Sequence, residues 1–231
     1  FGAIKTDGTL WTWGSNTGTA DGTSGLGIGI TTLVARRSSP GQTVAGGTTW
    51  CQVAMGANYN SGALTTTGTM WTWGCNNCGV LADGTTLNRC SPVQTIDGAT
   101  TWCQISFSTY HAAGIKTNGT LWTWGGNSAG QLGIGSAILC TIGQTQSSPV
   151  QVIGAATTWC CTLLGGNSAI KTDGTLWTWG CGTQGALGDG TTVSKCSPVQ
   201  TNCGATTWKQ VCSMANSACL LYTSDAADDL L

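Results

Sequence analysis

The sequence lacks glutamate altogether and holds few charged residues of any kind. Its 231 residues include 8 Lys and Arg, 9 Asp and a single His. Charged residues make up 7% of the chain, against roughly 25% in an average soluble domain. Amphipathic helices present a charged outer stripe, so this shortage argues against a helical fold. It also argues against nucleic-acid binding, because the only adjacent pair of cations is Arg36 and Arg37.

Long apolar segments are also missing. No run of 18 apolar residues occurs, so the sequence predicts no membrane-spanning helix and no membrane insertion. An initiator Met is absent too, and the chain starts at Phe1 inside a repeat. Any targeting segment is therefore expected upstream of this residue.

Glycine and tryptophan are abundant instead, with 36 and 12 residues. The tetrapeptide Trp-Thr-Trp-Gly occurs four times at spacings of 60, 51 and 55 residues, and Thr-Thr-Trp follows each copy. Every tryptophan is therefore a structural repeat position. These positions are Trp11, Trp13, Trp50, Trp71, Trp73, Trp102, Trp122, Trp124, Trp159, Trp177, Trp179 and Trp208.

Each repeat contains a hairpin pattern. In Ala3–Gly14, two apolar runs flank a Thr-Asp-Gly turn. Alternation puts Trp11 and Trp13 on one face of the second strand and Leu10 on the other, so both faces carry groups to bury. A third strand is expected from the Thr-Thr-Trp motif, as at Trp50–Met55, and Ser-Pro-Val-Gln adds a short fourth.

A sheet of about 50 residues that is apolar on both faces has to stack between copies of itself. Radial stacking gives a β-propeller. A β-helix needs a shorter repeat and a helical solenoid needs a 3.6-residue period, and neither is found. We predict an all-β fold, a β-propeller fragment of about four four-stranded blades open at both ends. It spans residues 1–218, with repeats at about 1–60, 61–112, 113–167 and 168–218.

The segment Trp124–Gly133 resembles the signature of the regulator of chromosome condensation repeat, and the similarity extends over residues 1–218. Repeat 4 keeps the signature around Leu187, and repeat 2 matches it less closely around Leu81. In repeat 1 the Gly-Leu-Gly part of the signature comes later, at Gly25–Gly27, after an insertion. The resemblance implies a propeller of seven blades, of which four repeats are little more than half. An incomplete ring exposes the faces and edges of its end blades, so poor solubility is expected.

The last residues break the repeat pattern. Cys219–Asp229 resembles the translation of a transposase-type sequencing adapter, and a natural acidic tail is the alternative. On the first interpretation, residues 219–231 are a non-native tail. Without Asp225, Asp228 and Asp229, 6 acidic residues remain beside 8 basic ones, and the formal net charge moves from -1 to +2.

Thirteen cysteines favour an oxidising compartment, with the protein secreted or displayed on a cell surface or virion. Repeats 2 and 4 each carry two cysteines 15 residues apart, and repeats 1 and 3 lack both. This joint gain and loss predicts disulfides between Cys75 and Cys90 and between Cys181 and Cys196, each closing a loop and contributing roughly 3 kcal/mol. Independent free thiols are the alternative.

No metal site or cofactor is predicted. Cys75, Cys78 and Cys90 fall short of the four ligands of structural zinc, and repeat 4 does not reproduce Cys78. Calcium requires several converging carboxylates, and each Asp-Gly turn offers one. The remaining repeat cysteines directly follow the third-strand Trp and are expected to be small buried side chains. They are Cys51, Cys103 and Cys160.

Catalytic residues are not predicted either, because catalysis needs a nucleophile, a base and an orienting group. His111 occupies a position that Asn60, Asn167 and Asn216 fill in the other repeats, which indicates a structural role. The remaining candidates, Asp7, Asp83, Asp173 and Asp189, lie in Asp-Gly turns, and turn formation explains them. We expect a protein that is not an enzyme.

The loop after Trp-Thr-Trp-Gly, counted through the next Pro, alternates in length, with 26 and 24 residues in repeats 1 and 3 and 18 in repeats 2 and 4. The long loops are expected to project from one propeller face, where such scaffolds bind. Neutral drift of surface loops is the alternative. The candidate binding residues are Arg36, Arg37, Leu139 and Gln144.

The function expected from these features is non-catalytic binding of another protein through the loops, in an extracellular or surface setting. The family resemblance implies a guanine-nucleotide exchange factor for a small GTPase as an alternative. That activity needs a charged loop, for which the sequence offers Arg36 and Arg37. Glycan binding is a further alternative, favoured by exposed Trp, but tryptophans at repeat positions are expected in the core.

Overall fold

The computed structural model describes the chain except for residues 17–24, 30–35, 136–144, 155, 163–166, 203, 205, 215–216 and 223–231, and gives the backbone alone at 162, 209–214 and 217–222. The described residues form seventeen strands and one 3-10 turn, η1 (Thr183–Gly185), so the all-β prediction is confirmed. Within this part, no helix has the length and apolar character needed to cross a membrane.

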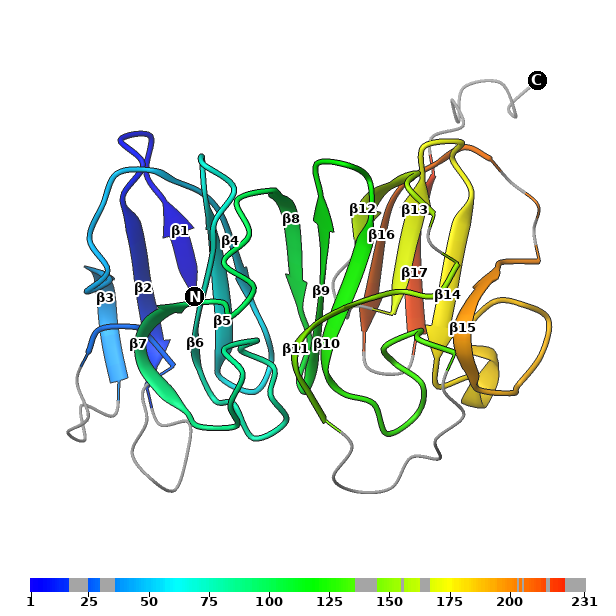
Figure 1. Cartoon of the computed structure of the whole chain (residues 1–231), viewed down its shortest axis with the longest axis horizontal. Helices are drawn as coiled ribbons and strands as arrows, with labels where there is room; N and C mark the ends of the chain where they lie inside the picture. The colour runs from blue at the N-terminus through cyan, green and yellow to red at the C-terminus, as the bar shows by residue number, and fades with distance from the viewer. Residues whose placement is uncertain are drawn as a thin grey trace.

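The strands form five antiparallel sheets that follow one another along the chain (Figure 1). The first sheet contains β1 (Gly2–Ile4), β2 (Leu10–Ser15) and β3 (Arg36–Gln42). The second contains β4 (Trp50–Met55), β5 (Asn60–Thr65), β6 (Met70–Gly74) and β7 (Arg89–Gln94). The third contains β8 (Trp102–Phe107), β9 (His111–Lys116), β10 (Leu121–Gly126) and β11 (Thr145–Gln151).

The fourth sheet contains β12 (Trp159–Thr162), β13 (Ser168–Lys171), β14 (Leu176–Gly180) and β15 (Lys195–Gln200). The last contains β16 (Trp208–Met214) and β17 (Ser217–Tyr222). Strand β17 includes Cys219 and the three residues after it, so the backbone of the segment interpreted as a non-native tail begins within a strand. The non-native origin of that segment stays a prediction.

The sheets do not coincide with the repeats drawn from the sequence. Strand β4, which falls at the end of repeat 1, pairs with β5 and opens the second sheet. The four-residue segment 56–59 joins these two strands, and so short a connection favours antiparallel pairing. The complete sheets therefore span 50–94, 102–151 and 159–200.

Neighbouring sheets pack face to face, and tryptophan fills the space between them. The second Trp of the tetrapeptide is fully buried in three sheets, at Trp73, Trp124 and Trp179. Trp124 lies in one core cluster with Leu64 and Met70 of the sheet before it. Seven of the twelve tryptophans are buried and five are half-buried, as expected for repeat positions.

The loops that follow the Trp-Thr-Trp-Gly motifs are tied to their own sheets, and the first three are also tied to the next sheet. In four sheets the Thr of the motif donates a 2.6 Å hydrogen bond to a leucine carbonyl in the loop. In repeat 2 this leucine is Leu81, which is fully buried. The carbonyl just before it, on Val80, accepts a 2.8 Å hydrogen bond from Nε1 of Trp124 in the following sheet. Trp73 and Trp179 make the same contact with Gly25 and Gln131.

Polar side chains connect the sheets at further points. The Gln52 amide accepts a hydrogen bond from the Ile105 backbone N–H and donates one to the Ile105 carbonyl, both at 3.1 Å. Asn60 donates to the carbonyl of Thr109 at 2.8 Å. Because each of these groups is paired across a sheet boundary, the contacts fix how one sheet sits on the next.

Two leucines of one loop provide a test of this packing. Replacing the buried Leu81 with Ala is expected to lower the free energy of unfolding by about 2 to 5 kcal/mol, because it leaves a cavity between the second and third sheets. Leu87→Ala, at a side chain that is 63% exposed, should change it by about 0.5 kcal/mol or less. Urea unfolding followed by tryptophan fluorescence measures both. Equal effects would contradict the proposed packing role of Leu81.

Candidate protein-binding face

The loops after the Trp-Thr-Trp-Gly motifs emerge at one end of the sheets, together with the turns between the first and second strands. This end, at the bottom of Figure 1, is called the loop face. Its described parts include segments 56–59, 75–88 and 181–194. The turns between the second and third strands of each four-stranded sheet and the connections between sheets lie at the opposite end, called the turn face.

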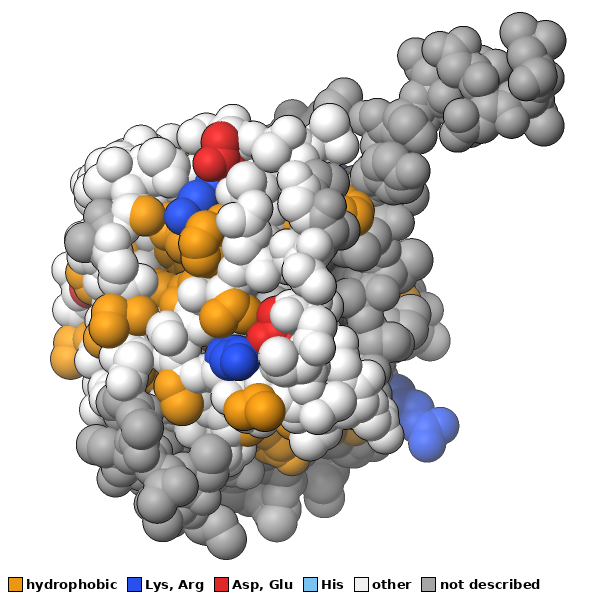
Figure 2. Space-filling model, turned by 90° about the vertical axis from the view of Figure 1, so that its right-hand side faces the viewer, with side chains coloured by type: hydrophobic (Ala, Val, Ile, Leu, Met, Phe, Trp, Pro, Cys, Tyr) orange, Lys and Arg blue, Asp and Glu red, His pale blue; other side chains and the backbone are white. Residues whose placement is uncertain are grey.

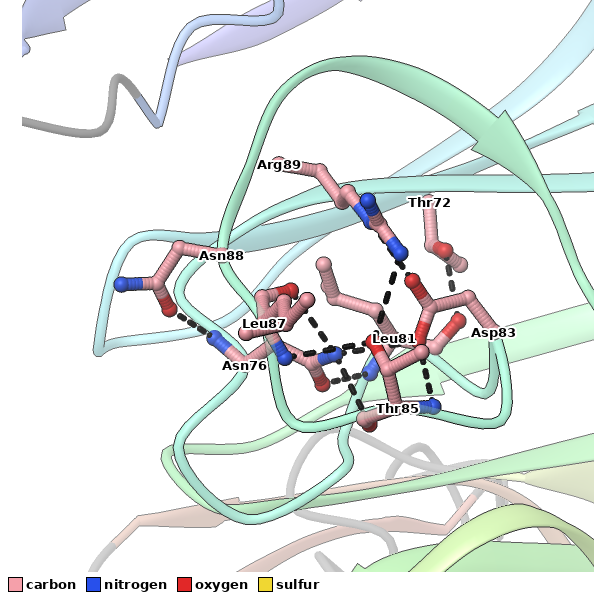
Figure 3. A network of polar contacts seen from close by, with 8 residues as sticks. All are labelled: Thr72, Asn76, Leu81, Asp83, Thr85, Leu87, Asn88 and Arg89. Atoms are coloured by element: carbon pink, nitrogen blue, oxygen red, sulfur yellow. Dashed lines mark hydrogen bonds and ion pairs between the residues drawn. The ribbon is translucent and has the colours of Figure 1, made fainter.

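In repeat 2 the loop folds around the buried side chain of Asn76 (Figure 3). Its Oδ1 accepts a hydrogen bond from the backbone N–H of Leu81 at 2.9 Å. Its Nδ2 lies 3.0 to 3.1 Å from Asp83 Oδ1 and from the carbonyls of Thr85 and Leu87. A single amide therefore satisfies polar groups from both halves of the loop.

The same amide recurs in other repeats. Asn16 and Asn127 accept from the N–H of Leu26 and Leu132 at 3.3 and 3.1 Å. Sequence reasoning did not single out these residues, although their recurrence two residues after the motif glycine is visible in the sequence. Repeat 4 has Gly182 at this position.

An ion pair closes the short loops of repeats 2 and 4. Arg89 Nε lies 2.6 Å from Asp83 Oδ2, and the Asp83 side chain is 5% exposed. The equivalent Lys195 lies 3.3 Å from Asp189. The long loops of repeats 1 and 3 have Ile28 and Ile134 in place of the acid. Loop length and this ion pair therefore change together between repeats.

The predicted disulfides are not formed, because Cys75, Cys90, Cys181 and Cys196 are all free thiols in the structure. Gly74 pairs directly with Arg89, and Gly180 with Lys195, so each cysteine pair is two residues out of step across its strands. That offset corresponds to about 8 Å between Cα atoms, beyond the roughly 7 Å that a disulfide spans. The geometry therefore does not support the predicted bonds.

Large apolar side chains are exposed on the loop face. Tyr59 and Tyr110 occupy equivalent turns of neighbouring sheets and are 37% and 53% exposed. Their carbonyls accept hydrogen bonds from the N–H of Cys75 and Gly126 at 3.2 and 2.8 Å, so each turn is held to the end of the third strand, where the following loop begins. Tyr59 has a φ of 57°, which is strained for a bulky residue and is found where surrounding contacts fix the backbone.

Sequence comparison identifies the repeat. The model for the "Regulator of chromosome condensation (RCC1) repeat" matches residues 67–115, 118–162 and 173–220, and a second RCC1 repeat model matches 102–131. The chain belongs to the RCC1 repeat family. The family resemblance drawn from Trp124–Gly133 is thus confirmed.

Relatives with RCC1 repeats are larger than this chain. The ultraviolet-B receptor UVR8 of Arabidopsis thaliana is 27% identical over 202 residues, covering 86% of this chain and 43% of the receptor. The human probable E3 ubiquitin-protein ligase HERC3 is 30% identical over 208 residues, or 86% of this chain and 18% of the ligase. Most of the ligase therefore lies outside the part that matches this chain.

Solved structures support the propeller fold. Yeast RCC1 (Prp20), in a complex with Kap60, aligns with a TM-score of 0.75 at 19% identity, covering 99% of this chain and 54% of the matched one. Human WBSCR16 aligns with a TM-score of 0.70 at 20% identity, covering 91% and 52%. The chain thus spans about half the length of these propellers.

Of the four residues predicted from the sequence to bind a partner, two lie among the described residues. Arg36 and Arg37 begin strand β3, paired with Ser15 and Gly14, instead of lying in a loop. Arg36 is exposed at the loop face and Arg37 is half-buried. Leu139 and Gln144 lie outside the described residues. A binding role for these four residues stays a prediction.

The candidate catalytic groups have structural contacts. His111 is buried and its Nε2 is hydrogen-bonded to Asn167 Oδ1, as Asn60 bonds across the preceding boundary between sheets. Asp173 accepts hydrogen bonds from the side chain and backbone of Thr175, which lower the pKa of its carboxyl. Among the described residues, no three His, Cys, Asp or Glu side chains are grouped to hold a metal.

The expectation that Cys51, Cys103 and Cys160 are buried is wrong, because all three are exposed. Each lies at a β-bulge just after the first Trp of its sheet. A bulge turns one extra residue out of the regular alternation. Each thiol donates to a carbonyl of the partner strand at 3.3 to 3.4 Å. Partial desolvation raises the pKa of all three thiols, and that of Cys160 to about 11.

Alkylation tests the state of the loop cysteines. Iodoacetamide added under denaturing, non-reducing conditions is expected to modify Cys75, Cys90, Cys181 and Cys196, because their register keeps the thiols apart. Peptide mass spectrometry measures the modification, with a reduced sample as the control. A disulfide-linked peptide containing Cys75 and Cys90 would contradict the structure.

Acid tests the ion pair that closes the repeat 2 loop. Burial by itself raises the pKa of Asp83, but hydrogen bonds from Thr85 and Arg89 and the Arg89 charge outweigh it, so the pKa falls below 3.8. The folded-state pKa is thus the lower one. Its stabilisation is complete above pH 3.8 and is lost as pH falls through the folded value.

Asp83→Asn should lower the free energy of unfolding by about 1 to 3 kcal/mol at pH 7, because Arg89 loses a charged partner. The variant should also lose part of the acid sensitivity of the wild type below pH 4. Urea unfolding at a series of pH values measures both effects. Parallel pH curves for the two proteins would show that Asp83 does not carry the effect.

Proposed function

We propose that this RCC1-repeat chain is a non-catalytic scaffold that binds another protein through its loop face. The observation that carries the proposal is the exposure of Tyr59 and Tyr110 at equivalent turns of adjacent sheets. Tyrosine is enriched in protein interfaces, where its ring contributes apolar area and its hydroxyl a hydrogen bond. The turns are held by backbone hydrogen bonds to the loops, so little order has to be gained on binding.

Other exposed apolar side chains extend this surface. Leu87 and Val193 occupy equivalent positions in the short loops of repeats 2 and 4, and both are exposed. The acids and bases of the same loops pair with each other, as Asp83 does with Arg89. The described loop face is therefore apolar and aromatic with few free charges, which suits the centre of a protein interface.

The fold neighbours support a protein partner. Prp20 has been crystallised with Kap60, and a second structure of Prp20p was described together with its binding properties to Gsp1p and histones. These are properties of Prp20. They make Gsp1p and histones reasonable first probes for this chain. The secreted or surface location expected from the thirteen cysteines stays a prediction.

The alternatives have less support. Nucleotide exchange would need a charged loop, and the described loop face offers only Arg36 and Arg37 outside its ion pairs. Glycan stacking would need exposed tryptophan rings, and every described tryptophan is buried or half-buried. We therefore propose neither activity.

Replacing both loop-face tyrosines tests the proposal. Tyr59→Ala combined with Tyr110→Ala should weaken partner binding about tenfold or more, because aromatic anchors contribute a large share of interface energy. Binding to arrayed proteins that include Gsp1p and histones is measured by biolayer interferometry. The matched control is Val44→Ala with Ile96→Ala, which removes exposed apolar side chains from equivalent positions in the connections between sheets and leaves both tyrosines in place.

The control variant should bind like the wild type. Equal weakening by both double variants, or no weakening by the tyrosine variant, would contradict a role for the loop face. Release of labelled GDP from Gsp1p on addition of the chain would support nucleotide exchange instead.

A further inference from the structure

A groove lies at the turn-face end of the fourth sheet, with a volume of about 270 Å³. It is lined by the connection from the third sheet and by one face of the fourth: Ile153, Gly154, Ala156, Trp159, Lys171, Trp177, Ser197 and Pro198. Hydrophobic side chains lie beside cationic ones on this side of the molecule (Figure 2). A space of this size accommodates one or two side chains, which is less than a drug-sized ligand needs.

The floor of the groove holds a cation between two tryptophans. The rings of Trp159 and Trp177 meet edge to face, with centroids 6.3 Å apart. Lys171 Nζ lies 3.8 Å from the Trp177 centroid and 5.0 Å from that of Trp159. Lys171 belongs to none of the ion pairs found among the described residues. The ammonium is therefore positioned by the rings. The nearby carboxylate of Asp173 lies outside ion-pair distance, but the Lys171 charge contributes to lowering the pKa of Asp173.

The equivalent groove of the third sheet has the same construction and is already filled. Lys116 Nζ lies 4.2 Å from the centroid of Trp122 and 4.6 Å from that of Trp102. Asp97, from the connection that precedes this sheet, places its carboxylate 3.4 Å from Lys116 Nζ. The Thr95 hydroxyl donates to the same carboxylate at 2.9 Å and holds it in place. The chain thus supplies its own anion to this lysine.

In the second and third sheets, the acid at the Asp97 position and the lysine at the Lys116 position are either both present or both absent. In the second sheet, the position of Lys116 is Thr65 and the position of Asp97 is Ala45. In the fourth sheet, Lys171 is present but Gly154 takes the place of Asp97. Among the second, third and fourth sheets, only the fourth has the lysine without an acid at the position of Asp97. The fourth sheet has Asp173 in its turn, where the third sheet has Asn118.

We propose that this groove binds an extended peptide segment of a partner protein through an Asp or Glu side chain on Lys171. The bound carboxylate takes the place that Asp97 fills in the third sheet. A neighbouring apolar side chain of the peptide packs on Trp177 and on Ile153, whose side chain is 51% exposed. Pairing the ammonium with a carboxylate beside apolar walls is favourable because the charge is partly shielded from water. The groove does not include the tyrosines that carry the proposed function, so this inference does not depend on it.

Selection from a displayed library of random peptides on the immobilised chain tests the chemistry of the ligand. The enriched peptides are expected to share an acidic residue next to an apolar one. Isothermal titration with one enriched peptide should show a single site. Replacing the acidic residue of the peptide with its amide should weaken binding at least tenfold.

Three variants, each using a residue found at the same position of another sheet, locate the site. Lys171→Thr, with Thr as at residue 65, should weaken binding at least tenfold, and the matched control Lys116→Thr should leave it unchanged. Asp97→Ala, with Ala as at residue 45, should open the third-sheet groove and raise the stoichiometry from one to two. Near-ultraviolet circular dichroism of the tryptophans confirms that each variant is folded.

Several results would overturn the proposal. These are a selection that enriches no peptide, enriched peptides without an acidic residue, undiminished binding to Lys171→Thr, and a stoichiometry that stays at one in Asp97→Ala. Weaker binding in the tyrosine double variant of the loop face, with Lys171→Thr unaffected, would place the peptide on the loop face and also overturn the inference.

Discussion

The contact between a tryptophan indole and a loop carbonyl of the preceding sheet is the interaction on which the rest of this structure depends. Trp124 fills the space between two sheets and donates to the carbonyl of Val80, while the Leu81 carbonyl accepts from Thr72 of its own sheet. The loop is thereby part of the core at one point and part of the surface a few residues later. A side chain such as Leu87 can be exposed on a fixed backbone, because Leu81 in the same loop is buried.

The chain has few charged residues, and each described ion pair holds together a particular part of the structure. The described ion pairs join Asp83 to Arg89, Asp97 to Lys116, and Asp189 to Lys195. Two of them close short loops, and the third fills the groove of the third sheet. Where Gly154 replaces Asp97, Lys171 keeps only the charge interaction with Asp173, which lies outside ion-pair distance. Gly154 in place of Asp97 therefore changes the chemistry of a whole groove.

Much of the fold was predictable from the sequence because each repeat states the same pattern. Apolar runs around Asp-Gly turns gave the hairpins, and the recurrence of tryptophan gave the stacked core. The phase of the repeat was not predictable, since a periodic sequence defines the period without defining where a sheet begins. Trp50 lies within the first repeat of the sequence but pairs in the second sheet, because a short connection joins β4 to β5.

The site was less predictable, because its chemistry depends on register. Cys75 and Cys90 appear together in the sequence, but their strands place them two residues out of step. Asn76 acts through the backbone of Leu81, Thr85 and Leu87, which only the folded loop brings near its amide. Cys51 is exposed because of a bulge that hydrophobic alternation does not indicate.

Comparing equivalent positions among the repeats separates residues needed for packing from residues available for binding. Positions that stay the same between sheets, such as Trp73, Trp124 and Trp179, satisfy the packing that every sheet requires. A position that differs while its surroundings stay the same is free of that packing requirement. Lys171 meets this condition, because its two tryptophans are retained while its acid is replaced. The tyrosines of the loop face meet it as well, since glycine or alanine stands at their positions in the last two repeats. Comparison among the repeats of one chain can thus indicate where binding has been added to a common fold.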